Sequence, residues 1–200
     1  MPRPTFTVIV PTSGRPTLAA ALASVSDQLE PGDELILVCS NDGDFGNAAR
    51  NAALERARGS HLVFLDDDDE YLPGGFATMR GMADKHPGRL LVFLKRWEVY
   101  GDAYGAVTAA VFPNLPGKLG RFAPADDSIM RDLRPGETVE QLRQRRGDME
   151  FVRTTLELQG GELLHIPQAV YVVRPEKSRW RRFRFRLDLR RRLGIGRRRR

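Results

Sequence analysis

Short runs of β-branched and aliphatic residues alternate with alanine- and leucine-rich segments of helical periodicity in the first half of this chain. The aliphatic runs predict buried strands, and the periodic segments between them predict helices. This alternation is typical of a parallel sheet with right-handed crossovers and helices on both faces. The predicted strands lie at 5–10, 34–39, 61–65 and within 89–97, and the predicted helices at 18–29, 45–58 and 76–85.

The second half is less regular. Its expected elements are a strand over 107–112, helices over 136–146 and 148–159, and short strands over 163–166 and 169–173. A loop rich in proline and glycine covers residues 113–124, and loops of this length often carry function. We expect residues 114–122 to form a lid or a wall of the binding site.

The charge of the chain divides near residue 176. The net charge is +6, but residues 178–200 contain twelve arginines and one acid, Asp188, which leaves −5 on the rest. We therefore expect a mildly acidic globular domain over residues 1–175 and a basic, arginine-rich tail over residues 176–200.

Cysteine content and hydropathy exclude several classes of protein. The single cysteine, Cys39, excludes a disulfide framework and a cysteine-based zinc site. No apolar stretch has the length of a signal peptide core or of a transmembrane helix. These features predict a soluble, cytoplasmic protein.

Polar residues follow three of the predicted strands. Pro11-Thr12-Ser13-Gly14, Asn41-Asp42-Gly43 and the run Asp66–Asp69 each stand directly after a strand. Ligands of parallel α/β sheets bind beyond the carboxyl ends of the strands. One crevice is therefore expected to collect these groups, although Asn41-Asp42-Gly43 is also an ordinary turn sequence.

Four adjacent carboxylates repel one another, and a divalent cation would compensate them because Mg²⁺ and Mn²⁺ prefer carboxylate oxygens. In an extended chain, residues two apart point the same way. Asp66 and Asp68 are then expected to converge on one metal, with Asp69 on the other side of the ion or binding a sugar hydroxyl. The alternative is a solvated acidic loop.

Other phosphate- and metal-binding motifs are absent. An EF-hand loop that begins at Asp66 would need glycine and glutamate where Tyr71 and Ala77 stand. Neither the Walker phosphate-binding loop nor the dinucleotide fingerprint occurs in the sequence.

Taken in order, four strings resemble glycosyltransferase family 2, which comprises nucleotide-sugar-dependent enzymes of GT-A fold. They are TVIVPTSGRPTLAAALASV, DELILVCSNDGD, ARNAALERARG and HLVFLDDDDEYLPGG, which together cover about residues 5–75. Gly147-Asp148-Met149-Glu150-Phe151 is similar to the family's acidic motif at the start of a late helix. The resemblance implies an α/β, GT-A-like fold of Rossmann type, with a mostly parallel sheet flanked by helices.

The resemblance also implies roles for individual residues. Asp148 would be the general base, although Asp148 is also a good helix N-cap residue and the two roles are compatible. Arg50 would bind the nucleotide, with a solvated helix position as its alternative. The implied nucleotide-sugar-binding set is Pro11, Thr12, Asp42, Arg50 and Asp67, and the implied metal-binding set is Asp66 and Asp68, to which Asp69 is added.

The implied reaction is the metal-dependent transfer of a sugar, with inversion, from a UDP- or GDP-linked donor to a hydroxyl of a glycan or lipid-linked acceptor. Mn²⁺ or Mg²⁺ would be the cofactor. Two alternatives stay open. One is a non-catalytic adaptor that keeps the fold and binds membranes or polyanions, and the other is a metal-dependent nucleotide hydrolase.

The tail combines arginines with aromatic and leucine side chains. Such a segment is typical of contact with an anionic membrane surface. Nucleic acid attracts the same charge, but the −5 of the remaining chain indicates that nucleic acid is not the main partner. We expect residues 178–200 to hold the protein at the inner face of the cell membrane, with a disordered solubilising tail as the alternative.

Overall fold

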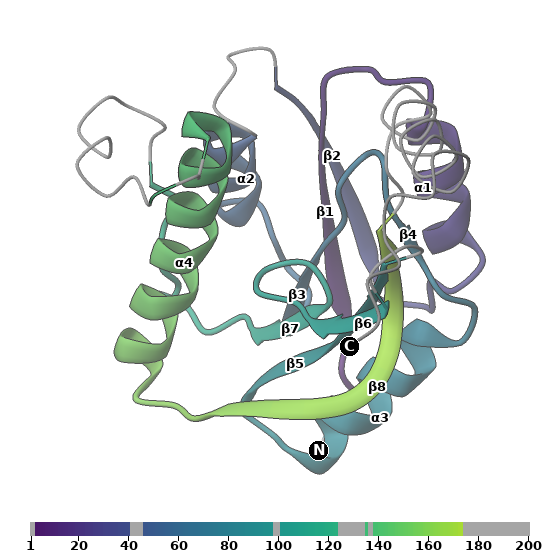
Figure 1. Ribbon diagram of the computed structural model, residues 1–200. Coiled ribbons are helices and arrows are strands. Elements are labelled where there is room, and N and C mark those ends of the chain that lie inside the picture. Colours follow the sequence, from purple (N-terminus) through teal and green to yellow (C-terminus); the bar gives the residue numbers. More distant parts are fainter. Residues whose placement is uncertain (1–2, 41–45, 98–100, 124–134, 136–137, 174–200) are drawn as a thin grey trace, which may run out of the picture.

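The computed structural model describes residues 3–40, 46–97, 101–123, 135 and 138–173 (Figure 1). The predicted α/β alternation is confirmed over the first half of the chain. The elements, in chain order, are β1 (Phe6–Thr12), α1 (Leu18–Ser26), β2 (Glu34–Cys39), α2 (Asn47–Leu54), β3 (His61–Phe64), β4 (Glu70–Tyr71), α3 (Gly75–Lys85), β5 (Leu90–Trp97), β6 (Gly101–Tyr104), β7 (Ala110–Pro113), α4 (Val139–Gln159) and β8 (Leu163–Val173).

One mixed sheet holds all the strands, in the order β2-β1-β3-β7-β5-β8-β4, with β6 paired to β5. The two longest ladders are parallel and join β5 to β8 and β1 to β2, and β1 also pairs in parallel with β3. The antiparallel strand β7 joins these two parallel parts, because it pairs with both β3 and β5. The carboxyl ends of β1, β2 and β3 therefore meet at one edge of the sheet.

Helices cover both faces of the sheet, with α1 and α3 on one side and α2 and α4 on the other (Figure 1). Side chains of β1 alternate between the two faces, as the period of two in a strand requires. Val8 and Val10 pack with Val25 of α1, whereas Ile9 packs with Phe151 of α4. Burial of β1 on both faces explains its continuous apolar sequence.

The helix α4 is one helix over Val139–Gln159, where the sequence indicated two. Asp148 lies inside it, so the interpretation of Asp148 as an N-cap is wrong. Gly147 explains the error. A Cβ at Gly147 would lie 2.5 Å from Nδ2 of Asn47, so the absence of a side chain lets α4 pack closely against α2. This glycine is a packing residue and does not end the helix.

The strand β8 is also continuous, where two short strands around Pro167 were expected. Its ladder with β5 shifts register between Ile166 and Ala169, which removes the need for a backbone donor at Pro167. In the described part of the chain, no helix combines the length and apolar character that a bilayer span requires.

Hydrogen bonds and ring stacking hold the loop after β7 in place as far as residue 123, which contradicts its interpretation as a lid. Asn51 of α2 donates to the carbonyl of Phe122 and accepts from the amide of Phe122, each at 2.9 Å. The Phe122 ring stacks on Phe151 of α4, with ring centroids 4.3 Å apart. The amide of Gly120 donates to Thr155 of the same helix at 2.8 Å. This part of the loop is a fixed wall between α2 and α4.

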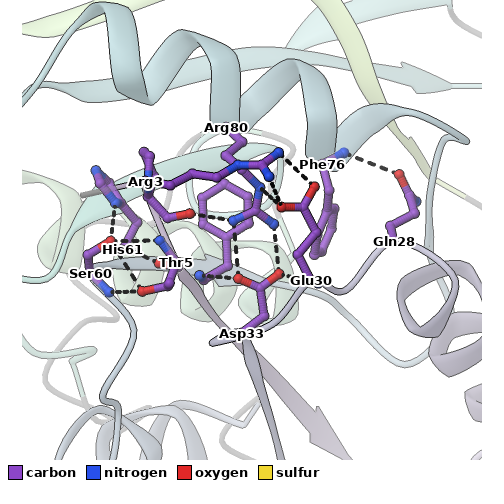
Figure 2. Close-up of polar contacts among 11 residues, drawn as sticks. Arg3, Thr5, Gln28, Glu30, Asp33, Ser60, His61, Phe76 and Arg80 are labelled. Atoms are coloured by element: carbon purple, nitrogen blue, oxygen red, sulfur yellow. Dashed lines mark hydrogen bonds and ion pairs between the residues drawn. The ribbon is translucent and has the colours of Figure 1, made fainter. Parts of the chain in front are cut away.

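A buried ion pair closes the opposite end of the sheet, where β1 begins (Figure 2). The Asp33 and Arg80 side chains are 0% and 4% exposed, and Arg80 donates to both carboxylate oxygens of Asp33 at 2.7 and 3.1 Å. Asp33 also accepts from the backbone amides of Phe6 and Glu30, each at 2.8 Å. The guanidinium lies 4.5 Å from the ring centre of Phe6. The network joins β1, the start of β2 and α3.

Replacing Asp33 with alanine is expected to lower the free energy of unfolding by about 3–5 kcal/mol, because the buried Arg80 would keep only the more distant carboxylate of Glu30, at 3.4 Å, and the amides of Phe6 and Glu30 would lose their acceptor. Urea unfolding followed by circular dichroism measures this loss. Arg3→Ala is the matched control, since it removes an ion pair to Glu30 from a side chain that is 71% exposed, and about 1 kcal/mol or less is expected. Equal effects of the two variants would contradict the assigned role of Asp33.

Replacing Gly147 with alanine is expected to destabilise the protein, although alanine stabilises an ordinary helix by about 1 kcal/mol relative to glycine. The new methyl group would displace Asn47, which donates to the carbonyl of Ala123 at 2.9 Å. Gly81→Ala in α3 is the control, because a Cβ at Gly81 meets nothing within 4 Å. Urea unfolding should show opposite signs for the two variants, and a stabilised Gly147→Ala protein would disprove the close helix contact.

Candidate active site

The loops after β1 and β3 are joined at the carboxyl edge of the sheet. The hydroxyl of Thr12 donates to Oδ2 of Asp67 at 2.7 Å, and the amide of Ser13 donates to the same oxygen at 3.2 Å. Thr12 and Asp67 are both buried. The structure thus brings together two residues of the expected nucleotide-sugar site, and the Asp67 carboxylate positions the loop after β1.

The aspartate run forms a turn. The amide of Asp69 donates to the carbonyl of Asp66 at 3.1 Å, which closes a four-residue turn over 66–69. The extended geometry that was expected to point Asp66 and Asp68 the same way is therefore wrong. Asp67 and Asp69 are buried, whereas Asp66 and Asp68 keep partial exposure.

Arg50 of α2 holds the first aspartate of the turn. Its Nη2 donates to Oδ1 of Asp66 at 2.6 Å. The Arg50 side chain is 8% exposed, donates to Oδ1 of Asn47 at 3.5 Å and lies 5.4 Å from the ring centre of Phe122. The alternative of a solvated arginine is excluded by this burial, so Arg50 is part of the site.

Arg15, in the loop after β1, holds the third aspartate. Its Nη1 lies 2.6 Å from Oδ2 of Asp68 and 3.5 Å from Oδ1 of Asp67. Burial raises the pKa of Asp68, the negative charges of Asp66 and Asp67 raise it further, and Arg15 opposes the shift. The carboxylates of the turn are therefore close enough to repel one another, and positive charge nearby stabilises them.

No group of three or more histidine, cysteine, aspartate or glutamate side chains gathers around one point in the part of the chain that the structure describes. The expected metal ligands Asp66 and Asp68 are each paired with a different arginine. Asp69 is buried, and its role as a metal ligand stays a prediction.

Pro11 and Asp42 complete the expected nucleotide-binding set. Pro11 is buried at the end of β1, and a Cβ at Gly46, before α2, would lie 2.8 Å from Cβ of Pro11. Gly46 has a φ of 79°, which favours glycine. Pro11 thus positions the start of the helix that carries Arg50. Asp42, like the tail, lies outside the described residues.

Asp148 approaches the aspartate turn from α4. The protein around it raises the pKa of Asp148 to about 6: removal from water is the largest cause, the positive charges of Arg50 and Lys95 oppose the shift, and the negative charge of Asp66 adds to it. A carboxylate with a pKa of about 6 is a stronger base than an ordinary aspartate at neutral pH. Charged side chains of α2, β5 and the turn are thus near enough to Asp148 to act on its charge.

Four further residues of the site were not predicted from the sequence. Tyr171 of β8 accepts a hydrogen bond from the amide of Asp66 at 3.2 Å, more than a hundred residues away in sequence, so no local pattern pointed to it. Asn47 stands one helical turn before Arg50, a spacing that places both side chains on one face. Arg15 and Lys95 complete this group.

A glycosyl transferase family 2 model matches residues 41–109. The match includes Arg50 and the aspartate turn, whereas Thr12 and Asp148 lie outside it. A comparison with curated proteins gives no match.

Solved structures of S. aureus TarS share the fold. The crystal structure of TarS aligns with a TM-score of 0.56 at 15% identity and covers 88% of this chain and 38% of that one. Structures of TarS 1-349 in complex with UDP and with UDP-GlcNAc align with TM-scores of 0.59 and 0.54, at 15% and 14% identity. They cover 88% and 86% of this chain and 62% and 59% of TarS 1-349, so this chain spans less than two thirds of each of them. The family model over residues 41–109 and the shared GT-A-like fold agree with the resemblance to glycosyltransferase family 2 seen in the sequence.

Proposed function

We propose that this protein is a glycosyltransferase that uses a nucleoside diphosphate sugar. The observation that carries the proposal is the meeting of the aspartate turn 66–69, Arg50 and Asp148 at the carboxyl edge of the sheet in a family 2 domain. The TarS structures in complex with UDP and UDP-GlcNAc support a UDP-linked donor. A GDP-linked donor is the alternative.

The nucleotide part of the donor would lie over the edge formed by β1, β2 and α2. Arg50 offers guanidinium N–H groups at this edge, and the exposed Ser13 and Gly14 continue the loop after Thr12. Guanidinium groups match diphosphate oxygens in charge and geometry. Asp42 is proposed to contact the base, on the strength of its sequence position alone.

A divalent cation fits the donor set of the turn. Asp66 and Asp68 offer carboxylate oxygens. Burial and the negative charges of Asp66 and Asp67 raise the pKa of Asp68, and a cation would relieve that repulsion. Two carboxylates suffice, because Mg²⁺ usually takes its other ligands from water and substrate phosphates. A bound Mn²⁺ or Mg²⁺ would stabilise the negative charge that develops on the leaving diphosphate.

Asp148 is proposed to act as the general base. Its carboxylate accepts the proton of the acceptor hydroxyl while the hydroxyl oxygen bonds to the anomeric carbon of the sugar. The bond from that carbon to the diphosphate oxygen breaks, and the diphosphate leaves with the electron pair. Attack opposite the leaving group inverts the anomeric configuration. Arg50 and Lys95, both positive and near Asp148, keep the carboxylate from being protonated at neutral pH.

The acceptor and the location of the protein are proposed from the sequence alone. A glycan or a lipid-linked envelope acceptor and a site at the inner face of the membrane agree with the arginines of residues 178–200. The adaptor and the hydrolase are distinguished by activity. An adaptor releases no diphosphate, a hydrolase releases it without acceptor, and a transferase needs the acceptor.

Manganese is expected to strengthen the binding of UDP by about tenfold or more, equivalent to about 1.4 kcal/mol. Asp68→Asn should abolish this gain, because the cation would lose a carboxylate. Isothermal titration with UDP, with and without Mn²⁺, measures both effects. Asp27→Asn, an exposed change at the end of α1, is the control and should bind as the unchanged protein does. A manganese-dependent gain that survives in Asp68→Asn would exclude the proposed ligand.

Asp148→Asn is expected to lower the transfer rate by about 10²–10⁴-fold while UDP binding stays the same, because the amide cannot accept the proton. In the unchanged protein the carboxylate form prevails above its pKa of about 6. The rate should therefore rise with pH through about 6 and level off above it. Diphosphate release from UDP-GlcNAc with an acceptor extract, between pH 5 and 8, measures the profile. A rate that is flat down to pH 5 would remove Asp148 from this role.

A further inference from the structure

Two arginines hold neighbouring aspartates of one turn, but they differ in burial. Arg50 lies 2.6 Å from Asp66 and is 8% exposed, whereas Arg15 lies 2.6 Å from Asp68 and is 43% exposed. The two pairs have the same shortest distance between guanidinium and carboxylate. The difference in exposure therefore decides how easily each pair separates.

The Arg50 pair is fixed by its surroundings. Arg50 stands on α2, contacts Asn47 and lies against the Phe122 ring, and the hydrogen bonds of Asn51 hold Phe122 in place. Withdrawal of Arg50 from Asp66 would leave a buried charge without its partner, and such a loss is costly. Arg50 is thus a permanent part of the site.

The Arg15 pair is more open to water. Arg15 stands in the exposed loop between β1 and α1, directly after Gly14, whose φ of 80° turns the chain. Water screens an ion pair whose arginine is this exposed, so the Arg15 pair separates more easily than the buried Arg50 pair. The Asp68 side chain is itself 24% exposed, which leaves its carboxylate open to another cation.

Asp68 nevertheless needs positive charge close to it, because the carboxylate of Asp67 lies beside it: Arg15 contacts the two carboxylates at 2.6 and 3.5 Å. Arg15 can leave only if another cation takes its place. A diphosphate attracts a guanidinium more strongly than a single carboxylate does, because it carries more charge and accepts paired hydrogen bonds. A diphosphate and a divalent cation that arrive together would therefore satisfy both Arg15 and Asp68.

We propose that Arg15 is an exchangeable counter-ion that couples diphosphate binding to cation binding. In the free protein Arg15 occupies Asp68. When a nucleoside diphosphate binds, Arg15 turns to the diphosphate and Asp68 receives the divalent cation. This inference rests on the proposed function. Because coupling between two ligands is reciprocal, each ligand should raise the affinity for the other by the same factor.

Manganese binding by the full-length protein tests the proposal, measured by isothermal titration without UDP and with saturating UDP. We compare the unchanged protein with Arg15→Gln and with Arg3→Gln, which removes one exposed arginine at the far end of β1. In the unchanged protein, UDP should raise the affinity for Mn²⁺ by about 10–100-fold, a coupling of typical size. Arg15→Gln should bind Mn²⁺ alone about tenfold more tightly and show a coupling factor about tenfold smaller than that of the unchanged protein. Arg3→Gln should behave as the unchanged protein does.

Two results would overturn the exchange. If Arg15→Gln changes the affinity for Mn²⁺ by the same factor with and without UDP, Arg15 acts only as a distant charge. If the affinity for Mn²⁺ alone does not rise, Arg15 does not compete with the cation. Failure of the proposed function is a separate result, because the unchanged protein would then bind no UDP at any manganese concentration. Thermal unfolding of each variant, expected near that of the unchanged protein, confirms that the variants are folded.

Discussion

Repulsion among four adjacent carboxylates is the constraint around which the candidate site is organised. The turn 66–69 separates the carboxylates, and each of the first three has a different partner: Arg50 from α2, Thr12 from β1 and Arg15 from the loop after β1. Since these partners come from three segments of the chain, the turn can form only when the sheet and α2 are in place. The acidic run thus depends on the fold and does not act as an independent motif.

Asp148 extends the same argument to the second half of the chain. Its helix must pass close enough to α2 for Arg50 to influence its carboxylate, and Gly147 permits that approach by leaving room for Asn47. The stacked rings of Phe122 and Phe151 help to fix the position of α4 over the sheet. The candidate site therefore has two parts, Asp148 on α4 and the aspartate turn after β3. Packing between the helices and the sheet holds these two parts together.

Local patterns in the sequence were sufficient for the strands β1, β2 and β3, because β-branched runs closed by proline, glycine and aspartate leave few alternatives. They also placed Thr12 and the aspartates at the carboxyl edge of the sheet, because these residues follow strand ends, whereas Arg50 was indicated only by the resemblance to the family. Local patterns were not sufficient where contacts between residues far apart in the sequence determine the structure. Gly147 suggests a helix break in the sequence, and only the structure shows that the Asn47 side chain occupies the space beside it. No residue pattern near Tyr171 indicates its hydrogen bond with the amide of Asp66. The exposure that separates Arg15 from Arg50 is also a property of the folded chain alone.

An aspartate–arginine ion pair lies at each end of the parallel strands, but the two pairs have different roles. Asp33 and Arg80 are shielded from water and bound to the backbone of β1 and its neighbours, so their separation would be costly and the pair holds the fold. Asp68 and Arg15 are in similarly short contact, but Arg15 is 43% exposed, so separating this pair costs less. Burial, not distance, distinguishes a structural ion pair from one that can give way to a ligand. A site that must accept a charged substrate therefore needs its pairs near the surface, which is where the loop after β1 places Arg15.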